Sequence, residues 1–393
     1  MATASLSLPQ RRDIDLRLDP GVLYPALALM MIGFVAISSA SVEFAAAKYG
    51  NASYHSDRHL IYMGLGLIGA VVVFVLPVKF WALTGWIWLF VALALLALVL
   101  IPGVGSKVNG SRRWLALGPL TLQASELAKL FLVVYLAGYL QRRRDEVCAQ
   151  WRGFIKPMAV VFAFTLLLLA EPDFGATVVT LGTAFGMLFL AGVRLANFLL
   201  VMLGSLLALG MLLVSESYRL KRLVAYTDPW ADQFDSGYQL TQSLIAFGRG
   251  EWFGVGLGNS VQKLFYLPEA HTDFVFAIWA EETGLVGALT VIALFLLLVF
   301  RIFAIARSRL LAGDCFGAHL CYGVALIIAS QAFINIGVST GLLPTKGLTL
   351  PLVSYGGSSL IVCCAMLAMV LRVEREGRLS DEPRQRRRGA GKQ

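Results

Sequence analysis

The stretch WALTGWIWLFVALALLALVLI, from Trp81 to Ile101, is 21 residues long and contains no charged side chain. A helix needs about 20 consecutive apolar residues to cross a hydrocarbon layer about 30 Å thick, so this stretch predicts a membrane-spanning helix. The whole chain has the same character, since 58% of its 393 residues are hydrophobic and only 15% are charged. In soluble domains about a quarter of all residues are charged, so the composition predicts an integral membrane protein.

Ten apolar stretches predict an all-α fold, a polytopic bundle of about ten transmembrane helices. They cover residues 22–41, 60–78, 81–101, 121–140, 155–171, 175–192, 195–214, 273–300, 315–338 and 351–371. An even number of spans puts both termini on one side of the membrane. With the termini in the cytoplasm, the inside segments carry 21 Lys and Arg residues and the outside segments carry 11. This bias agrees with the positive-inside rule.

The chain divides into a membrane domain and two ends. Residues 1–21 form a polar cytoplasmic segment that lacks the layout of a cleaved signal peptide. Residues 22–371 form the membrane domain, and residues 372–393 form a basic cytoplasmic tail that is expected to be disordered. The one long loop, residues 215–272, is predicted outside, where loops of this length usually carry function. In it, QLTQSLIAF has helical spacing and GRGEWFGVGLGNS indicates turns, so the loop is expected to re-enter the membrane or lie on its surface.

Charge, cysteines and motifs exclude several classes of function. The net charge of +9 owes much to eight basic residues between Arg372 and Lys392, which indicate topology rather than nucleic-acid binding. The five cysteines show no metal-ligand spacing. The sequence has neither a GxxxxGK[ST] nor an HExxH motif, so ATP-driven transport is not expected.

Ionisable residues in or beside the spans are candidates for function, because a charge inside a membrane costs about 2.5 to 3.5 kcal/mol on insertion scales. Glu126 and Lys129 lie three residues apart on one predicted helix and can pair. A structural ion pair and a substrate contact both remain open for them. Glu171 and Asp173 flank a proline between two spans. They suit a metal ion or an acid and a base, but the favoured interpretation is that Asp173 caps the following helix.

Asp273 is the strongest catalytic candidate, in the stretch LPEAHTDFVFAIWAEETG at the outer end of the eighth span. Glu281 lies two turns further along the same predicted face and is a supporting carboxylate. A carboxylate at a helix start is often only a cap or a partner of the helix dipole. An apolar wall and a facing basic loop would instead tune its pKa for work as a general base.

The stretch GLLPTKGLTLPLVSYGGSS interrupts the apolar pattern before the tenth span. A broken helix at membrane depth needs protein or a water-filled cavity around its free backbone groups, so this stretch is predicted to line a cavity. Its lysine and the backbone N–H groups of its turn suit a phosphate. Close helix packing through the glycines is the compatible alternative. The candidate contacts are Lys346, Ser354, Gly356, Gly357 and Ser358.

Arg112 and Arg113 belong to a basic outer rim and are further candidates for substrate binding. Together with the outward carboxylates and the long loop, this rim suits an anionic, lipid-anchored substrate. A diphosphate headgroup would fit it, because arginine forms strong charge-assisted hydrogen bonds to phosphate.

Five motifs carry a resemblance to a known family: NGSRRW, QASELAKL, EPDFG, PEAHTDFVFA with EETG, and LPTKGLTLPLVSYGGSS. Through them residues 20–372 resemble the SEDS family (shape, elongation, division and sporulation). The motif TKGLTLP and the basic tail resemble those of its FtsW cell-division branch rather than those of its RodA elongation branch. Two positions depart from the family pattern, since Ala124 stands for a proline and Glu171 for a glutamine.

The resemblance implies a ten-helix fold and peptidoglycan glycosyltransferase activity, with Asp273 matching the aspartate required for polymerisation. The implied reaction moves a lipid-linked glycan onto the 4-hydroxyl of a GlcNAc in lipid II and releases undecaprenyl diphosphate. Asp273 would be the general base. The basic rim would stabilise the diphosphate, with or without a divalent cation, Mg²⁺ or Mn²⁺.

The resemblance also implies partners and a location. The partners are lipid II, the undecaprenyl-linked glycan, a class B penicillin-binding transpeptidase and other membrane proteins of the division complex. The location is the septum of the bacterial cytoplasmic (inner) membrane.

Two other functions fit the same residues. A lipid II flippase would use the same cavity and charges, and it predicts transport without polymer. A non-catalytic division scaffold would act through the basic tail from Arg384 to Lys392. It predicts that this tail, and not Asp273, is essential.

Overall fold

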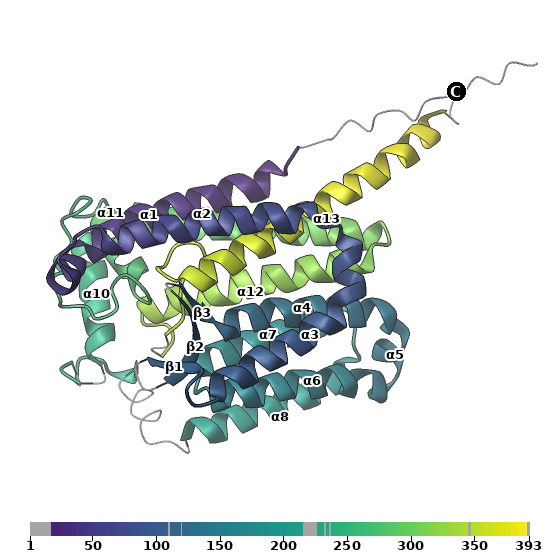
Figure 1. Ribbon diagram of the computed structural model, residues 1–393, viewed down its shortest axis with the longest axis horizontal. Coiled ribbons are helices and arrows are strands. Elements are labelled where there is room, and N and C mark those ends of the chain that lie inside the picture. Colours follow the sequence, from purple (N-terminus) through teal and green to yellow (C-terminus); the bar gives the residue numbers. More distant parts are fainter. Residues whose placement is uncertain are drawn as a thin grey trace, which may run out of the picture.

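Each of the ten predicted spans corresponds to a helix in the computed structural model, which describes residues 17–108, 111–118, 120–214, 226–231, 233–235, 237–344 and 347–390 (Figure 1). In chain order these helices are α1 (Pro20–Tyr49), α2 (Tyr54–Val75), α3 (Val78–Leu100), α4 (Ala124–Arg142), α6 (Trp151–Ala170), α7 (Phe174–Leu190), α8 (Leu195–Val214), α11 (Val275–Leu311), α12 (Cys315–Ser339) and α13 (Gly357–Ala390). Among the described residues, seven helices are long and apolar enough to cross a membrane, and α7 and α8 are shorter apolar helices. The predicted polytopic fold is confirmed.

Local sequence signals explain where several helices begin. α1 starts at Pro20, and the side chain of Asp19 accepts a hydrogen bond of 2.9 Å from the backbone N of Gly21. Proline at the first position and aspartate at the cap are both favoured at a helix start. Asp19 also forms an ion pair of 2.5 Å with Arg301 of α11, which ties the beginning of α1 to the bundle.

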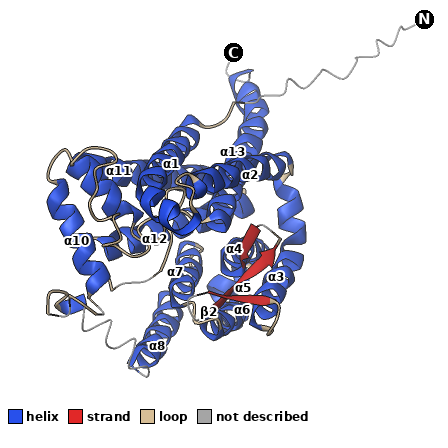
Figure 2. Ribbon diagram, turned by 60° about the vertical axis from the view of Figure 1, so that its left-hand side comes forward, coloured by secondary structure: helices blue, strands red, loops and turns tan. Residues whose placement is uncertain are grey.

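A small antiparallel sheet between α3 and α4 is absent from the pattern predicted by the apolar stretches. Its strands are β1 (Gly105–Val108), β2 (Ser111–Leu117) and β3 (Leu120–Gln123), in the order β1-β2-β3. The predicted span 121–140 therefore starts as β3, and α4 begins only at Ala124. The sheet, red in Figure 2, lies at the end of the bundle that also carries α10, whereas α5 (Arg144–Ala149) lies at the opposite end (Figure 1).

The C-terminal tail corrects another prediction. α13 is helical from Gly357 to Ala390, although disorder was expected after Arg372. Ion pairs one helical turn apart stabilise this extension, with 2.7 Å between Arg372 Nε and Glu376 Oε1. The C-terminal half of α13 projects away from the bundle (Figure 1).

α12 is the central helix of the bundle. It packs against α4, α7, α11 and α13, and most of its side chains are buried. Three polar residues, Gln331, Asn335 and Ser339, follow at four-residue spacing and are at most 1% exposed. Residues four apart share a helix face, so α12 presents one buried polar stripe to its neighbours.

The long loop contains the predicted helix, α10 (Tyr238–Gly250), and α10 packs against α11. α11 itself is interrupted at Gly284, where φ is 69° and ψ is −166°. Glycine tolerates this backbone conformation, and a Cβ atom at Gly284 would also lie 2.5 Å from the carbonyl oxygen of Trp252. The interruption and the close approach both require glycine at this position.

Backbone groups on both sides of the interruption bond to the segment that follows α10. Four hydrogen bonds of 2.9 to 3.2 Å run from Val255 N to Glu281 O, from Gly256 N to Glu282 O, from Leu285 N to Glu251 O and from Val286 N to Trp252 O. An unpaired backbone group is costly at membrane depth. The loop therefore completes the hydrogen bonding of α11.

Candidate active site

Asp273 lies just outside α11, which begins at Val275 with Phe274 as its N-cap. Asp273 is thus not the cap, and its side chain is partly buried. Its backbone carbonyl accepts a hydrogen bond of 2.8 Å from Nδ2 of Asn335. A Cβ atom added to Gly347 would lie 3.0 Å from Asp273 Oδ2. The carboxylate therefore lies against the segment that leads into α13.

The residues before Asp273 contact the turn that precedes α13. The backbone N of Tyr355 donates a hydrogen bond of 3.0 Å to the carbonyl of His271. The rings of His55 and His271 have centroids 4.6 Å apart, and the ring of Tyr355 lies 5.0 Å from that of His55. Burial lowers the pKa of His271 to about 4, so this ring is neutral at pH 7. It adds no positive charge beside Asp273.

The two candidate serines of the turn use their hydroxyls within the protein. Ser354 Oγ accepts a hydrogen bond of 2.8 Å from the backbone N of Leu350. Ser358 Oγ accepts one of 3.0 Å from the backbone N of Gln123 and donates one of 2.9 Å to the carbonyl of Thr121. These hydroxyls hold the turn and join α13 to β3, while a phosphate contact stays a prediction.

The two candidate glycines lie where α13 begins, and both are partly buried. A Cβ atom on Gly357 would lie 2.4 Å from the ring of Tyr62. The packing alternative is therefore confirmed for Gly357, and Gly356 lies next to it. Lys346 falls outside the described residues.

Arg112 and Arg113 are neighbours in β2, so their side chains point to opposite faces of the strand. Arg113 donates hydrogen bonds of 3.3 Å from Nε to the carbonyl of Glu171 and of 2.6 Å from Nη2 to the carbonyl of Pro172. Arg113 thereby holds the turn between α6 and α7. The two arginines do not act together on one face.

Asp173 caps α7, as the favoured interpretation predicts. Its carboxylate accepts hydrogen bonds of 3.1 Å from the backbone N of Ala176 and 3.2 Å from Ser125 Oγ. A carboxylate at this position satisfies a free N–H group of the first helical turn.

Glu171 is fully buried, and neither of its carboxylate oxygens has a hydrogen-bond partner among the described residues. Burial, together with the nearby charge of Asp173, raises the pKa of Glu171 to about 8. Asp173 is already engaged as the cap of α7. No group of three or more His, Cys, Asp or Glu in the described part of the chain could hold a metal ion.

Glu126 and Lys129 form the predicted ion pair inside the bundle. Lys129 Nζ lies 2.9 Å from Glu126 Oε1, and the two side chains are 2% and 4% exposed. This burial favours the structural interpretation over a direct contact with a substrate outside the bundle.

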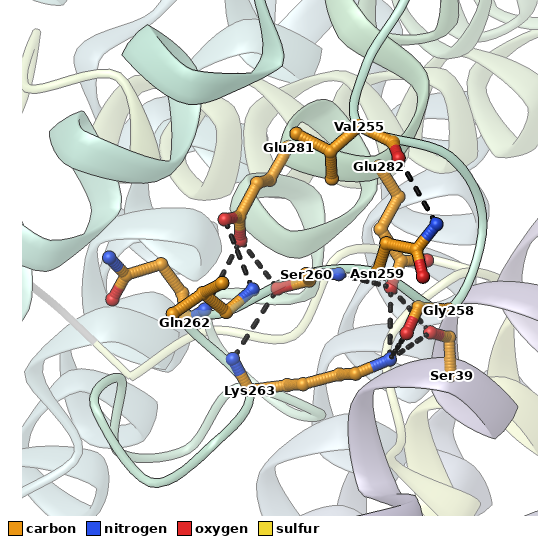
Figure 3. A network of polar contacts seen from close by, with 10 residues as sticks. Ser39, Val255, Gly258, Asn259, Ser260, Gln262, Lys263, Glu281 and Glu282 are labelled. Carbon is orange, nitrogen blue, oxygen red and sulfur yellow. Dashed lines mark hydrogen bonds and ion pairs between the residues drawn. The ribbon is translucent and has the colours of Figure 1, made fainter.

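Glu281 anchors the long loop through a network of polar contacts, which Figure 3 shows. It is fully buried, and Ser260 Oγ donates a hydrogen bond of 2.5 Å to its Oε2. The backbone N of Val261 and of Gln262 donate to the same carboxylate at 3.2 and 3.3 Å. Arg249 Nε lies 3.0 Å from its Oε1. Glu281 thus supports the loop and forms no described bond with Asp273.

Glu282 extends the network to α1. Its Oε1 accepts a hydrogen bond of 2.6 Å from Ser39 Oγ and lies 3.3 Å from Lys263 Nζ. The loop is therefore fastened to α11 by two adjacent carboxylates and to α1 through Ser39 (Figure 3).

Two residues that contact Asp273 were not among the predicted site residues: Asn335 and Gly347. His55 was also not predicted, and its ring lies against those of His271 and Tyr355. Asn335 had a signal in the sequence, because a polar side chain in the predicted span 315–338 is costly in a membrane and needs a partner. The contacts of Gly347 and His55 depend on tertiary packing and carry no such signal.

A pocket of about 570 Å³ lies between α10 and α11, and none of the predicted site residues is among the residues that line it. Its lining is mainly apolar and includes Phe247, Trp252, Phe276, Leu285 and Ile292.

Comparison with known proteins places the chain in a family. Residues 21–379 match the FtsW/RodA/SpoVE family, described as a cell cycle protein. The chain is 57% identical over 359 residues to a probable peptidoglycan glycosyltransferase FtsW of Hahella chejuensis, covering 91% of this chain and 90% of that protein. It is 53% identical over 367 residues to the FtsW of Pseudomonas fluorescens, covering 93% and 90%.

Solved structures agree with the sequence comparison. A chain from a study of how a peptidoglycan synthase complex coordinates polymerization and crosslinking is 33% identical, with a TM-score of 0.76, covering 92% of this chain and 98% of that one. The rod shape determining protein RodA of Thermus thermophilus is 31% identical, with a TM-score of 0.69 and the same coverage. The long apolar helices, the five motifs and these similarities together establish that the chain is a multi-pass membrane protein of the FtsW/RodA/SpoVE (SEDS) family.

Proposed function

We infer that this chain is a peptidoglycan glycosyltransferase that polymerises lipid II into glycan strands during septal cell-wall synthesis. Relatives named as probable peptidoglycan glycosyltransferases share 57% and 53% of their aligned residues with it. The observation that carries the proposal is the placement of Asp273. This partly buried carboxylate lies outside the helix, with its backbone held by Asn335 and its oxygen facing Gly347.

In the proposed reaction Asp273 is the general base. Its carboxylate takes the proton from the 4-hydroxyl of a GlcNAc in the acceptor lipid II, because a sugar hydroxyl is a poor nucleophile until its proton is drawn off. The hydroxyl oxygen bonds to the anomeric carbon of the lipid-linked donor as the bond from that carbon to the diphosphate breaks. The electron pair leaves with undecaprenyl diphosphate, and the proton remains on Asp273.

The departing diphosphate needs positive charge or N–H donors close to it. Lys346 directly precedes Gly347 in the sequence and is proposed as a point charge. Gly356 and Gly357 are proposed to offer backbone N–H groups at the start of α13. Arg112 is proposed to contribute positive charge from β2. Its neighbour Arg113 is instead engaged with the backbone carbonyls of Glu171 and Pro172.

The proposed place of action is the outer face of the bacterial cytoplasmic (inner) membrane at the division septum. A class B penicillin-binding transpeptidase is the proposed partner, because the similar chain comes from a complex that couples polymerization to crosslinking. Other membrane proteins of the division complex are proposed as further partners. A divalent cation is not assigned to the described residues, so no step depends on it.

The experiment is polymerisation of purified lipid II by the full-length chain in detergent together with its transpeptidase partner. Wild type is compared with Asp273→Ala and Asp273→Asn, and with Glu43→Gln at an exposed position of α1 as the control. We expect glycan strands from wild type and from Glu43→Gln. General bases contribute about 100-fold or more, so the two Asp273 variants should lose at least about 100-fold in rate while keeping the wild-type melting temperature.

Three other outcomes would contradict this proposal. Equal rates in wild type and folded Asp273→Ala would remove the general-base role. Movement of lipid II across vesicles without any polymer would indicate the flippase. Loss of cell division on deletion of residues 384–392, with Asp273 replaceable, would indicate the scaffold.

A further inference from the structure

Asn335 makes two hydrogen bonds that meet at a single nitrogen. Its side chain is 1% exposed in the last turns of α12. Nδ2 donates to the backbone carbonyl of Asp273 at 2.8 Å and to the backbone carbonyl of Leu348 at 2.6 Å. A primary amide carries two N–H groups on one nitrogen, so a single asparagine can bind both carbonyls at once.

The two carbonyls belong to segments that are far apart in the sequence and lack helical backbone at these points. Asp273 precedes the N-cap of α11, and Leu348 lies in the irregular stretch before α13. Gly347, next to Leu348, is the residue that faces the Asp273 carboxylate. The bonds of Asn335 therefore determine how the carboxylate lies relative to the segment opposite it.

Neighbouring contacts restrain both the amide and its helix. Both partners of Nδ2 are carbonyl oxygens, which only accept hydrogen bonds, so the amide must present its NH₂ group to them. Ser339 Oγ donates a hydrogen bond of 3.0 Å to the carbonyl of Asn335. Ser243 Oγ of α10 in turn donates one of 2.7 Å to the carbonyl of Ser339. The end of α12 is thus tied to the helix of the long loop.

We propose that Asn335 is a positioning residue for glycosyl transfer, which fixes Asp273 against the segment from Gly347 to Ser359 by bridging the carbonyls of Asp273 and Leu348. The inference rests on the proposed function, because it assigns Asn335 a part only if Asp273 is the base. Asn335 does not touch the substrate in this role. It therefore affects turnover and the ionisation of Asp273, and leaves the binding of lipid II unchanged.

The test uses the full-length chain with its transpeptidase partner and lipid II, and it measures kcat, KM and the pH dependence of polymerisation. Asn335→Asp keeps the shape of the side chain but replaces the NH₂ donor, and Asn335→Ala removes the bridge. Gln331→Leu is the control, since Gln331 is buried one turn earlier on the same face and has no described hydrogen-bond partner. Asp273→Ala is included in the same assay.

We expect both Asn335 variants to lose at least about tenfold in kcat with KM within about twofold of wild type, because small displacements of a reacting group are costly. The acid limb of the pH profile should shift in Asn335→Asp and not in Gln331→Leu. Asn335→Ala should add no further loss to Asp273→Ala, because residues that act as one unit are not additive.

Three results would overturn the proposal. The first is a wild-type kcat in folded Asn335→Ala while Asp273→Ala is inactive, which leaves the proposed function intact. The second is a polymerisation rate of Asn335→Asp that falls by the same factor at every pH, with thermal melting showing an equal loss of folded protein. This result would indicate a structural role. The third is full activity of Asp273→Ala, which removes the proposed base itself and is recognised independently of Asn335.

Discussion

Gly347 lies against the carboxylate of Asp273, since a Cβ atom on Gly347 would be 3.0 Å from Oδ2. We expect Gly347→Ala to lower the rate of lipid II polymerisation about tenfold, because the methyl group displaces the carboxylate by a few tenths of an ångström and a shift of about 1 Å can cost about 100-fold. The control is Gly66→Ala in α2, whose Cβ would lie 3.1 Å from Cys364 Sγ. Equal rates in the two variants would contradict the prediction.

Glu171 should make the stability of the protein depend on pH. Burial raises its pKa from 4.5 to about 8, so the folded state holds the proton more tightly than the unfolded state. The contribution of Glu171 to stability is therefore complete below about pH 4.5 and is lost as the pH rises through about 8. We expect the melting temperature of wild type to fall relative to that of Glu171→Gln between pH 5 and pH 9. Parallel melting profiles would refute this, and Glu43→Gln serves as the exposed control.

The Glu126–Lys129 pair can be tested by removing one charge or both. Glu126→Gln leaves a buried lysine without its partner, which costs about 3 to 5 kcal/mol for buried pairs, so we expect a large fall in melting temperature. Replacing both residues, Glu126→Met with Lys129→Leu, should restore most of the stability and of the polymerisation rate. A stable double variant without activity would instead assign the pair a contact with the substrate.

Glu281→Ala should detach the loop after α10 from α11. The change removes the acceptor of Ser260 Oγ and of two backbone N–H groups, and it leaves Arg249 unpaired. We expect a lower melting temperature and faster cleavage by trypsin at Lys263, because the released loop becomes accessible. Asp273→Ala should show neither effect. Cleavage of Glu281→Ala at the wild-type rate would show that the loop is held by other contacts.

The helices could be predicted from the sequence because the membrane itself sets their length and composition. α8 begins and ends at the residues where its apolar stretch does. The sheet was missed because β1 and β3 have only four residues each, too few for a clear alternating pattern. The helical tail was missed because its support comes from ion pairs between charged residues, and a charged composition alone suggests disorder.

The site divides in the same way. The apolar context and the motif around it single out Asp273 in the sequence, and the pairing of Glu126 with Lys129 follows from helical spacing. The contacts of Asn335 with Asp273 and Leu348 join positions that only the tertiary fold brings together. Glu281 shows the opposite case. It lies in the same sequence stretch as Asp273, yet its carboxylate binds the loop that follows α10.

The interruption of α11 at Gly284 limits how this protein can be recombined with its relatives. Since Glu251, Trp252, Val255 and Gly256 exchange backbone hydrogen bonds with residues 281–286, inserting or deleting one residue between positions 251 and 286 would shift this register and leave polar groups unpaired. A functional chimera must therefore exchange residues 238–311 as one block, with its junctions placed before α10 and after α11.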